Sequence, residues 1–185
     1  MDDHGLASVE GGRHPAWGTA NRIVPLGDAY LELIAVVNEA TAARSAFGRW
    51  VAAAPQGQPF GWAVRTDDID AVAARLGIEV VAGSRVSASG ALLSWRLAGT
   101  DEAAAEPFLP FFIEWGEGTP LPGNVAQATT RIEELRLMGD AERLAAWLGP
   151  HELPVTIRAG MPTVIGLALS GGICLPWKRP ADALP

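Results

Sequence analysis

Residues 61–99 read GWAVRTDDIDAVAARLGIEVVAGSRVSASGALLSWRLAG. Four apolar residues recur there at helical spacing and give a stripe that a sheet can cover: Ile69, Val72, Ala73 and Leu76. Asp67 or Asp68 can cap the N-terminus of this helix, and Gly77 can close its C-terminus. The flanking segments are predicted as strands, with a break at Gly83-Ser84: residues 61–66, 78–82 and 91–97. The stretch therefore predicts a strand–helix–strand–strand unit.

This unit recurs at an offset of 72 residues, which places residues 73–77 on residues 145–149. Two positions are glycine in all three copies: Gly5, Gly77 and Gly149, and Gly27, Gly99 and Gly171. One ends a helix and the other follows a strand, as glycine often does. The alternative is a coincidence among segments rich in alanine and glycine. The repeat predicts a truncated first unit, a helical linker, a second unit, a loop, a third unit and a loose tail: residues 1–37, 38–60, 61–116, 117–131, 132–175 and 176–185.

The first unit begins abruptly, because Gly5 corresponds to the glycine that ends the helix in the later copies. Its predicted strands cover residues 6–10, 18–27 and 29–36. The strand and helix that should precede Gly5 are absent, and this leaves an open sheet edge that must be covered. The strand over residues 132–138 could fill the edge. The alternatives are a second chain, which would make a homodimer, or a strand and helix encoded upstream of Met1.

Composition excludes several classes of function. The formal net charge of −7 argues against nucleic acid or an anionic membrane surface as a partner. No apolar stretch reaches the ~18 residues of a membrane span. Cys174 is the single cysteine, so no internal disulfide can form, and a cytoplasmic location is expected. The chain has three histidines, which makes a zinc site or a Ser-His-Asp triad less expected.

Several segments resemble one protein family: residues 12–15 (GRHP), 17–21 (WGTAN), 25–27 (PLG), 30–33 (YLEL), 66–70 (TDDID), 95–99 (WRLAG) and 109–115 (LPFFIEW). Together with the repeated unit, they resemble the vicinal oxygen chelate superfamily of glyoxalases, extradiol dioxygenases and bleomycin-resistance proteins, and most of all its glyoxalase-like branch. The expected fold class is therefore α+β. Repeated βαβββ-like units, the first truncated, should form a curved mixed sheet with helices on the convex face.

The resemblance also implies where a site would lie. In metal-dependent members, each module offers ligands from its first and last strands inside a cup, and the last-strand positions match Glu32 and Glu114. The first-strand positions carry no histidine, since the second copy offers Trp62 or Val64. Leu121 also replaces a histidine expected in this branch. We therefore expect no cofactor and no tightly bound metal, although Glu32 and Glu114 would be the ligands of a divalent ion.

Glu32 and Glu114 are single charges within apolar strands, where a carboxylate is costly unless it is paired or faces a wet cavity. They are predicted to face one cavity as catalytic residues, with His14 as a possible base. Alternatively, each pairs with an arginine, for which the candidates are Arg22, Arg65 and Arg96, and His14 is an exposed turn residue. Five further residues are expected to line the cup and bind substrate: Asn21, Arg22, Tyr30, Phe112 and Trp62. Trp17, Trp62 and Trp95 could form an aromatic wall.

Three hypotheses for function follow. The first is a protein that binds a small organic molecule in the cupped sheet, with unknown chemistry. The second is a metal-dependent lyase, isomerase or dioxygenase that uses Glu32, Glu114 and His14. The third is a non-catalytic assembly module, because the open edge of the first unit could pair with another chain.

Overall fold

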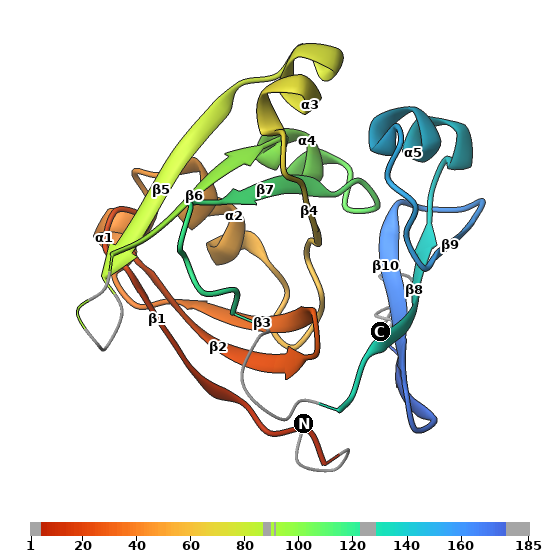
Figure 1. The fold of residues 1–185 in the computed structure, drawn as a ribbon, viewed down its shortest axis with the longest axis horizontal. Coiled ribbons are helices and arrows are strands. Elements are labelled where there is room, and N and C mark those ends of the chain that lie inside the picture. The colour runs from red at the N-terminus through yellow and green to blue at the C-terminus, as the bar shows by residue number, and fades with distance from the viewer. Residues whose placement is uncertain (1–4, 87–89, 91, 123–128, 177–185) are drawn as a thin grey trace, which may run out of the picture.

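The structure is a computed structural model that describes residues 5–86, 90, 92–122 and 129–176. Its strands form three separate sheets, here called A, B and C, with short helices around them (Figure 1). The predicted α+β class is confirmed. None of the helices in the described ranges is long and apolar enough to cross a membrane. The prediction of a loose tail falls mostly on residues 177–185, which lie outside the described residues.

Sheet A is an antiparallel meander of β1 (Val9–His14), β2 (Thr19–Leu26) and β3 (Ala29–Val36). A two-residue turn joins β2 to β3, and Gly27 in this turn has a φ of 75°, which favours glycine. The first strand was predicted over residues 6–10 and begins later in the chain. Residues 6–8 do not pair, and β1 continues through Gly11-Gly12 to His14. An irregularity between Glu10 and Gly12 lets β1 pass this diglycine while still pairing with β2.

The linker forms two helices in place of the single one predicted, α1 (Glu39–Ala42) and α2 (Ala46–Ala53). The chain leaves the helical conformation at Ser45, whose hydroxyl accepts a hydrogen bond from the backbone N–H of Gly48 and so caps α2. The amphipathic helix α2 packs its aromatic side chains on those of neighbouring elements. Phe47 lies 4.7 Å from Trp17, measured between ring centroids.

Sheet B contains the second predicted unit in full. Along the chain it comprises β4 (Ala63–Arg65), α3 (Ile69–Leu76), β5 (Val80–Val86), β6 (Leu92–Ala98), α4 (Thr100–Ala105) and β7 (Phe111–Trp115). The sheet order is β4-β7-β6-β5, with β4 parallel to β7. Helix α3 begins and ends as predicted. The Asp68 carboxylate accepts a hydrogen bond from the backbone N–H of Ala71, and Gly77 closes the helix with a φ of 69°.

Sheet C contains β8 (Ile132–Met138), α5 (Ala141–Leu148), β9 (Val155–Arg158), β10 (Thr163–Leu169) and β11 (Ile173–Pro176). The repeat predicts that the second and third copies share one arrangement of strands, and this prediction is wrong. In sheet B the first strand pairs with the last, whereas in sheet C β8 lies between β9 and β10, in the order β11-β10-β8-β9. The 72-residue offset therefore aligns only the strand–helix beginnings of the two units, and the different strand orders favour the alternative of a coincidence.

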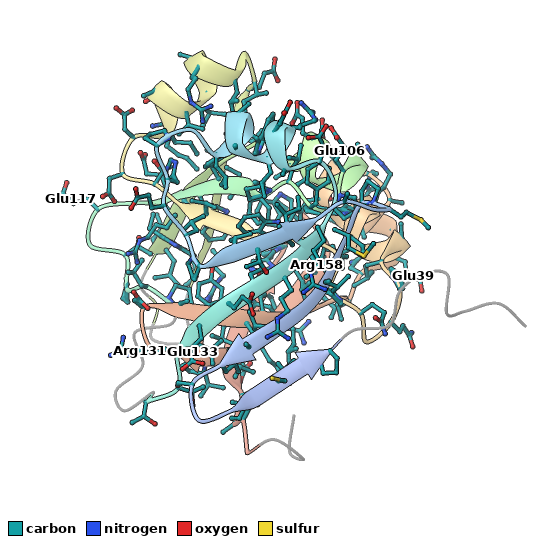
Figure 2. All side chains as sticks on the ribbon, turned by 90° about the vertical axis from the view of Figure 1, so that its right-hand side faces the viewer. Glu39, Glu106, Glu117, Arg131, Glu133 and Arg158 are labelled. Carbon is teal, nitrogen blue, oxygen red and sulfur yellow. The ribbon has the colours of Figure 1, made fainter. Side chains whose placement is uncertain are left out.

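Three apolar clusters are buried in the described part of the chain: one joins sheet B to its helices, one joins sheet A to sheet C, and one lies on the inner face of sheet B. Helices α3 and α5 cover one face of sheet B, where Val72, Phe112 and Trp147 belong to a single buried cluster. Sheet C packs on the outer face of sheet A near the β2–β3 turn, where Val24 and Leu26 of β2 contact leucines of β10 and β11. Leu33, farther along β3 on the same face, stays exposed. Arg131, labelled in Figure 2 near the start of β8, packs against the turn between β2 and β3.

The strand predicted to fill the open edge of sheet A does not do so. Within the described residues, β3 pairs with β2 alone, and β8 pairs with β9 and β10. Sheet C packs on part of the outer face of sheet A. The free edge of β3 pairs with no other strand of the described residues. A second chain on this edge stays a prediction. Sedimentation velocity at two protein concentrations would test for the homodimer.

Arg75 joins the second and third units, and its removal should destabilise the protein. Its guanidinium donates to the backbone carbonyls of Ala146 and Trp147 at 2.8 Å each, so it caps the C-terminus of α5. The side chain is exposed, which reduces its contribution. We expect Arg75→Ala to lower the free energy of unfolding by about 1–2 kcal/mol in urea denaturation. Arg65→Ala is the control, because the side chain of Arg65 makes no hydrogen bond or ion pair with the described residues. Equal losses in both variants would contradict this role.

Candidate functional site

The inner faces of sheets A and B look toward each other and meet where β1 runs beside β5 (Figure 1). Alternation along the strands sets which side chains lie on these faces. On sheet A, Ile23 of β2 lies opposite Glu32 of β3, and the same face carries Asn21 and Tyr30. On sheet B, the side chain of Arg85 in β5 crosses to the backbone of Gly12 in β1. Polar residues from both sheets therefore meet in one interior.

Glu32 combines exposure with strong desolvation. Its surface remains open to solvent, yet the surrounding protein raises the pKa of its carboxyl through desolvation, against the lowering effects of Asn21 and of the Arg85 charge. A carboxyl that is open on one side and enclosed on the others satisfies both observations. Asn21 Nδ2 donates to Glu32 Oε1 at 2.5 Å. A raised pKa makes this carboxyl a weaker acid than an ordinary glutamate, and such a shift is one way in which proteins prepare a carboxyl for acid–base chemistry.

Arg85 connects the polar groups of the interior electrostatically. Its positive charge acts on Glu32 and Tyr30 and lowers the pKa of His14. Desolvation and the Glu32 charge raise the pKa of Tyr30, so its hydroxyl keeps its proton at neutral pH. Desolvation in turn lowers the pKa of Arg85 itself. The guanidinium is therefore partly withdrawn from water, where its charge acts more strongly than on an open surface.

The diglycine of β1 makes room for this arrangement. A Cβ atom on Gly11 would overlap the side-chain amide of Asn21, and one on Gly12 would overlap the guanidinium of Arg85. Asn21 Oδ1 is enclosed and accepts no hydrogen bond from any residue that the structure describes. Such a group is uncommon in a folded protein. Gly11 and Gly12 thus serve as the surface on which two polar side chains rest.

His14 ends β1 and is buried, which contradicts the alternative of an exposed turn residue. Its Nδ1 lies 3.0 Å from Thr19 Oγ1, and its ring packs 5.5 Å from Trp17 and 5.9 Å from Trp95, between centroids. Burial, aided by the charge of Arg85, lowers the pKa of His14 to about 4. The imidazole is therefore neutral at pH 7.

A cavity of about 430 Å³ lies at the seam between β1 and β5. Its lining comes from the β1–β2 turn and from both faces of sheet B, which is possible because β5 is an edge strand: His14, Ala16, Trp17, Ala82, Gly83, Ser84, Ser94, Trp95, Arg96, Glu114 and Gly116. The volume is that of a small-molecule site. His14 links the cavity to the polar interior, because it lines the cavity and is reached by the charge of Arg85.

The structure does not bring Glu32 and Glu114 together. Glu114 shares its strand face with buried Phe112, as predicted, but this is the face that the helices cover. Its Oε2 accepts a hydrogen bond from the backbone N–H of Ile69 at 3.0 Å, and its Oε1 pairs with Arg96 at 3.2 Å. Arg96 also pairs with Asp70. The prediction of one cavity shared by both glutamates is wrong, and for Glu114 the alternative of an arginine partner is confirmed.

Three residues expected to bind substrate also lie away from Glu32. Arg22 alternates onto the outer face of sheet A and donates to the hydroxyl and carbonyl oxygens of Ser8, each at 2.9 Å. Trp62 donates to the carbonyl of Phe108 at 3.1 Å and packs against the core that contains Phe112. Phe112 itself is fully buried there. Of the expected aromatic wall, Trp17 and Trp95 face the interior.

Arg85 was missed because Gly83-Ser84 was interpreted as a break. In the structure β5 continues to Val86, and Gly83 pairs with Trp95. The indole of Trp95 lies over Gly83, where a Cβ atom would overlap it. The available signal was the alternation of Val81, Gly83 and Arg85, in which the glycine is a small inward-facing residue of a continuous strand.

The residues present do not fit the metal that the superfamily resemblance implies. A site for a divalent ion of this kind usually includes several carboxylate or imidazole donors converging on one point. Within the described residues, no group of three or more His, Cys, Asp or Glu side chains could hold an ion. Glu32 and Glu114, the two expected ligands, lie on different sheets and face different surroundings.

Comparison with known proteins agrees with this architecture. A family model described as a glyoxalase-like domain matches residues 1–153. Among solved structures, a hypothetical protein from Staphylococcus aureus is similar, with a TM-score of 0.68 and 18% sequence identity, over 89% of this chain and 82% of that chain. At this identity the likeness concerns the fold alone. No curated protein matches the sequence. Because the family model covers most of the chain, this protein belongs to the glyoxalase-like domain family.

Proposed function

We propose that this protein binds a small organic molecule between sheets A and B, next to Asn21, Tyr30, Glu32 and Arg85. The observation that carries the proposal is that polar side chains of two sheets converge there: Asn21 is hydrogen bonded to Glu32 on sheet A, and the guanidinium of Arg85 reaches the backbone of Gly12 from sheet B. Desolvation of a charged group is costly and is maintained where the group has a task. A carboxyl on a purely structural surface would gain nothing from such an environment.

The cavity at the seam between β1 and β5 also suits a ligand of modest size. Its volume is about 430 Å³, and it combines aromatic walls from Trp17 and Trp95 with a few polar groups, including His14, which is the usual composition of a small-molecule site. Phe47 and Trp50 of α2 continue the aromatic surface toward Phe111. The ligand would thus lie between an apolar wall and the polar cluster of the interior.

Protein-observed NMR with a library of small neutral, anionic and cationic compounds tests this proposal. Binders should shift the amide signals of β2, β3 and β5 around Asn21, Glu32 and Arg85. They should leave the signals of β9 and β11 in sheet C unchanged, since these strands lie outside the interior. Binders that shift only sheet C, or a library with no binder at all, would contradict the proposal and favour an assembly module instead.

A further inference from the structure

Arg85 is the cation that reaches the polar interior. Its charge acts on three groups from sheet A, namely His14, Tyr30 and Glu32. The neighbouring arginines have other partners on other faces. Arg22 donates to Ser8 on the outer face of sheet A, and Arg96 pairs with Asp70 and Glu114 on the helix side of sheet B.

The guanidinium of Arg85 is not committed to Glu32. The four ion pairs found within the described residues involve Arg96, which makes two, Arg136 and Arg143. The carboxylate of Glu32 is held instead by Asn21 Nδ2. A partly desolvated guanidinium presents a planar fork of donors that matches a carboxylate in two parallel hydrogen bonds.

The backbone of β1 next to the Arg85 guanidinium carries no side chain. Its guanidinium lies against Gly12, where any side chain would collide with it. Gly12 has no positive φ that would require glycine, so its lack of a side chain serves space and not backbone geometry. The same pattern holds one residue earlier, where Gly11 makes room for the amide of Asn21. Two adjacent glycines therefore preserve the position of the two polar groups that flank Glu32.

An apolar wall lies next to this cation on the same face of sheet B. Gly83 precedes Arg85 by two residues on β5, and the indole of Trp95 lies over Gly83. Trp17 packs 5.6 Å from Trp95, between ring centroids. A ligand with one charged end and one aromatic end would match both features at once.

Given the small-molecule site proposed above, we infer that its ligand is an aromatic carboxylate. Its carboxylate is bound by the Arg85 guanidinium above Gly12, and its ring lies against Trp95 and Trp17. The like charge of Glu32 opposes this anion and limits its affinity. Asn21 and Glu32 then face the part of the ligand next to its carboxylate.

Phenylacetate and phenylacetamide are the probes, because they share the ring and the methylene group, and a neutral amide in one replaces the anionic carboxylate that Arg85 would bind. Isothermal titration of the whole protein in a buffer free of carboxylates should show phenylacetate binding at least about tenfold more tightly than phenylacetamide. Arg85→Gln should remove this preference. Arg85→Lys should keep part of it, because an ammonium retains the charge without the planar fork.

Three further variants isolate the geometry and the neighbouring charge. Gly12→Ala should weaken phenylacetate binding by displacing the guanidinium, whereas Gly166→Ala, whose added Cβ would make only ordinary contacts from 3.4 Å outward, should leave it unchanged. Glu32→Gln should strengthen phenylacetate binding several-fold by removing a like charge. Arg22→Gln, on the outer face of the same sheet, is the control for lost net charge.

Equal binding of the two probes would overturn the inference, as would equal losses in Arg85→Gln and Arg22→Gln. Failure of phenylacetate to bind at millimolar concentration would overturn it as well. The proposed function has a separate outcome. Neutral compounds that shift the amide signals of β2, β3 and β5 would preserve the small-molecule site while excluding a carboxylate as its ligand.

Discussion

Replacing Phe112 by alanine should lower the free energy of unfolding by about 3–5 kcal/mol, the cost of deleting a buried aromatic side chain. The ring of Phe112 is fully buried in the core that joins sheet B to helices α3 and α5. It lies 6.3 Å from the ring of Trp147, between centroids. Its removal would leave a cavity between the second and third units, and chemical denaturation monitored by tryptophan fluorescence would measure the loss.

The neighbouring residue provides a matched control. Phe111 lies on the opposite face of β7, is partly exposed, and contacts Trp50 of α2. Phe111→Ala should cost less than half as much stability as Phe112→Ala, because less apolar surface is lost from a buried site. If Phe112→Ala were the milder variant, the assignment of Phe112 to the core and not to the ligand surface would be wrong.

Acidification should destabilise the native protein through His14. The native pKa of about 4 lies below the ordinary value of 6.5. Between these two values the unfolded state binds more protons, so stability falls as the pH decreases from 6.5 toward 4. The difference in pKa corresponds to a loss of about 3 kcal/mol once the pH lies below both values. Urea denaturation at a series of pH values would measure it.

Glu32 acts in the opposite direction, because its native pKa is raised. The folded state therefore holds a proton that unfolded glutamate releases, and stability rises as the pH falls through the native pKa toward the unfolded value. His14→Asn should make the acid loss shallower, and Glu32→Gln should make it steeper. A His14→Asn profile parallel to that of the wild type between pH 6.5 and 4 would show that His14 does not stay neutral in the native state.

Some features of this protein were determined by residues close together in sequence. Helix α3 was predicted correctly, because the apolar spacing and the cap at Asp68 act within a few residues, and α5 lies where the 72-residue offset places a second helix. The shared face of Phe112 and Glu114 also followed from sequence, since strand alternation is a property of the local backbone. The family resemblance rested on several short segments taken together, and the α+β class followed with it.

The site itself was predicted only in part. Asn21, Tyr30 and Glu32 were chosen correctly as members of one face, because β2 and β3 form a hairpin whose register a two-residue turn fixes. Arg22 was assigned to the same group and lies on the opposite face, as adjacent residues of a strand must. Arg85 was missed, because sequence alone does not show whether Gly83 lies in a turn or in a strand. The packing of Trp95 on Gly83 shows that the strand continues to Arg85.

Tertiary structure alone decided the remaining features. Which face of β7 looks inward depends on where α3 and α5 pack, and this sends Glu114 to Arg96 and to the N-terminus of α3. The strand order of sheet C depends on pairing between β8 and strands that follow α5. Apolar side chains of sheet C are buried in two of the cores. This burial competes with pairing of β8 to the edge of β3. The meeting of Arg85 with Gly12 joins residues of two different sheets. Such contacts depend on the packing of whole sheets, whereas periodicity and caps inform only about neighbours along the chain.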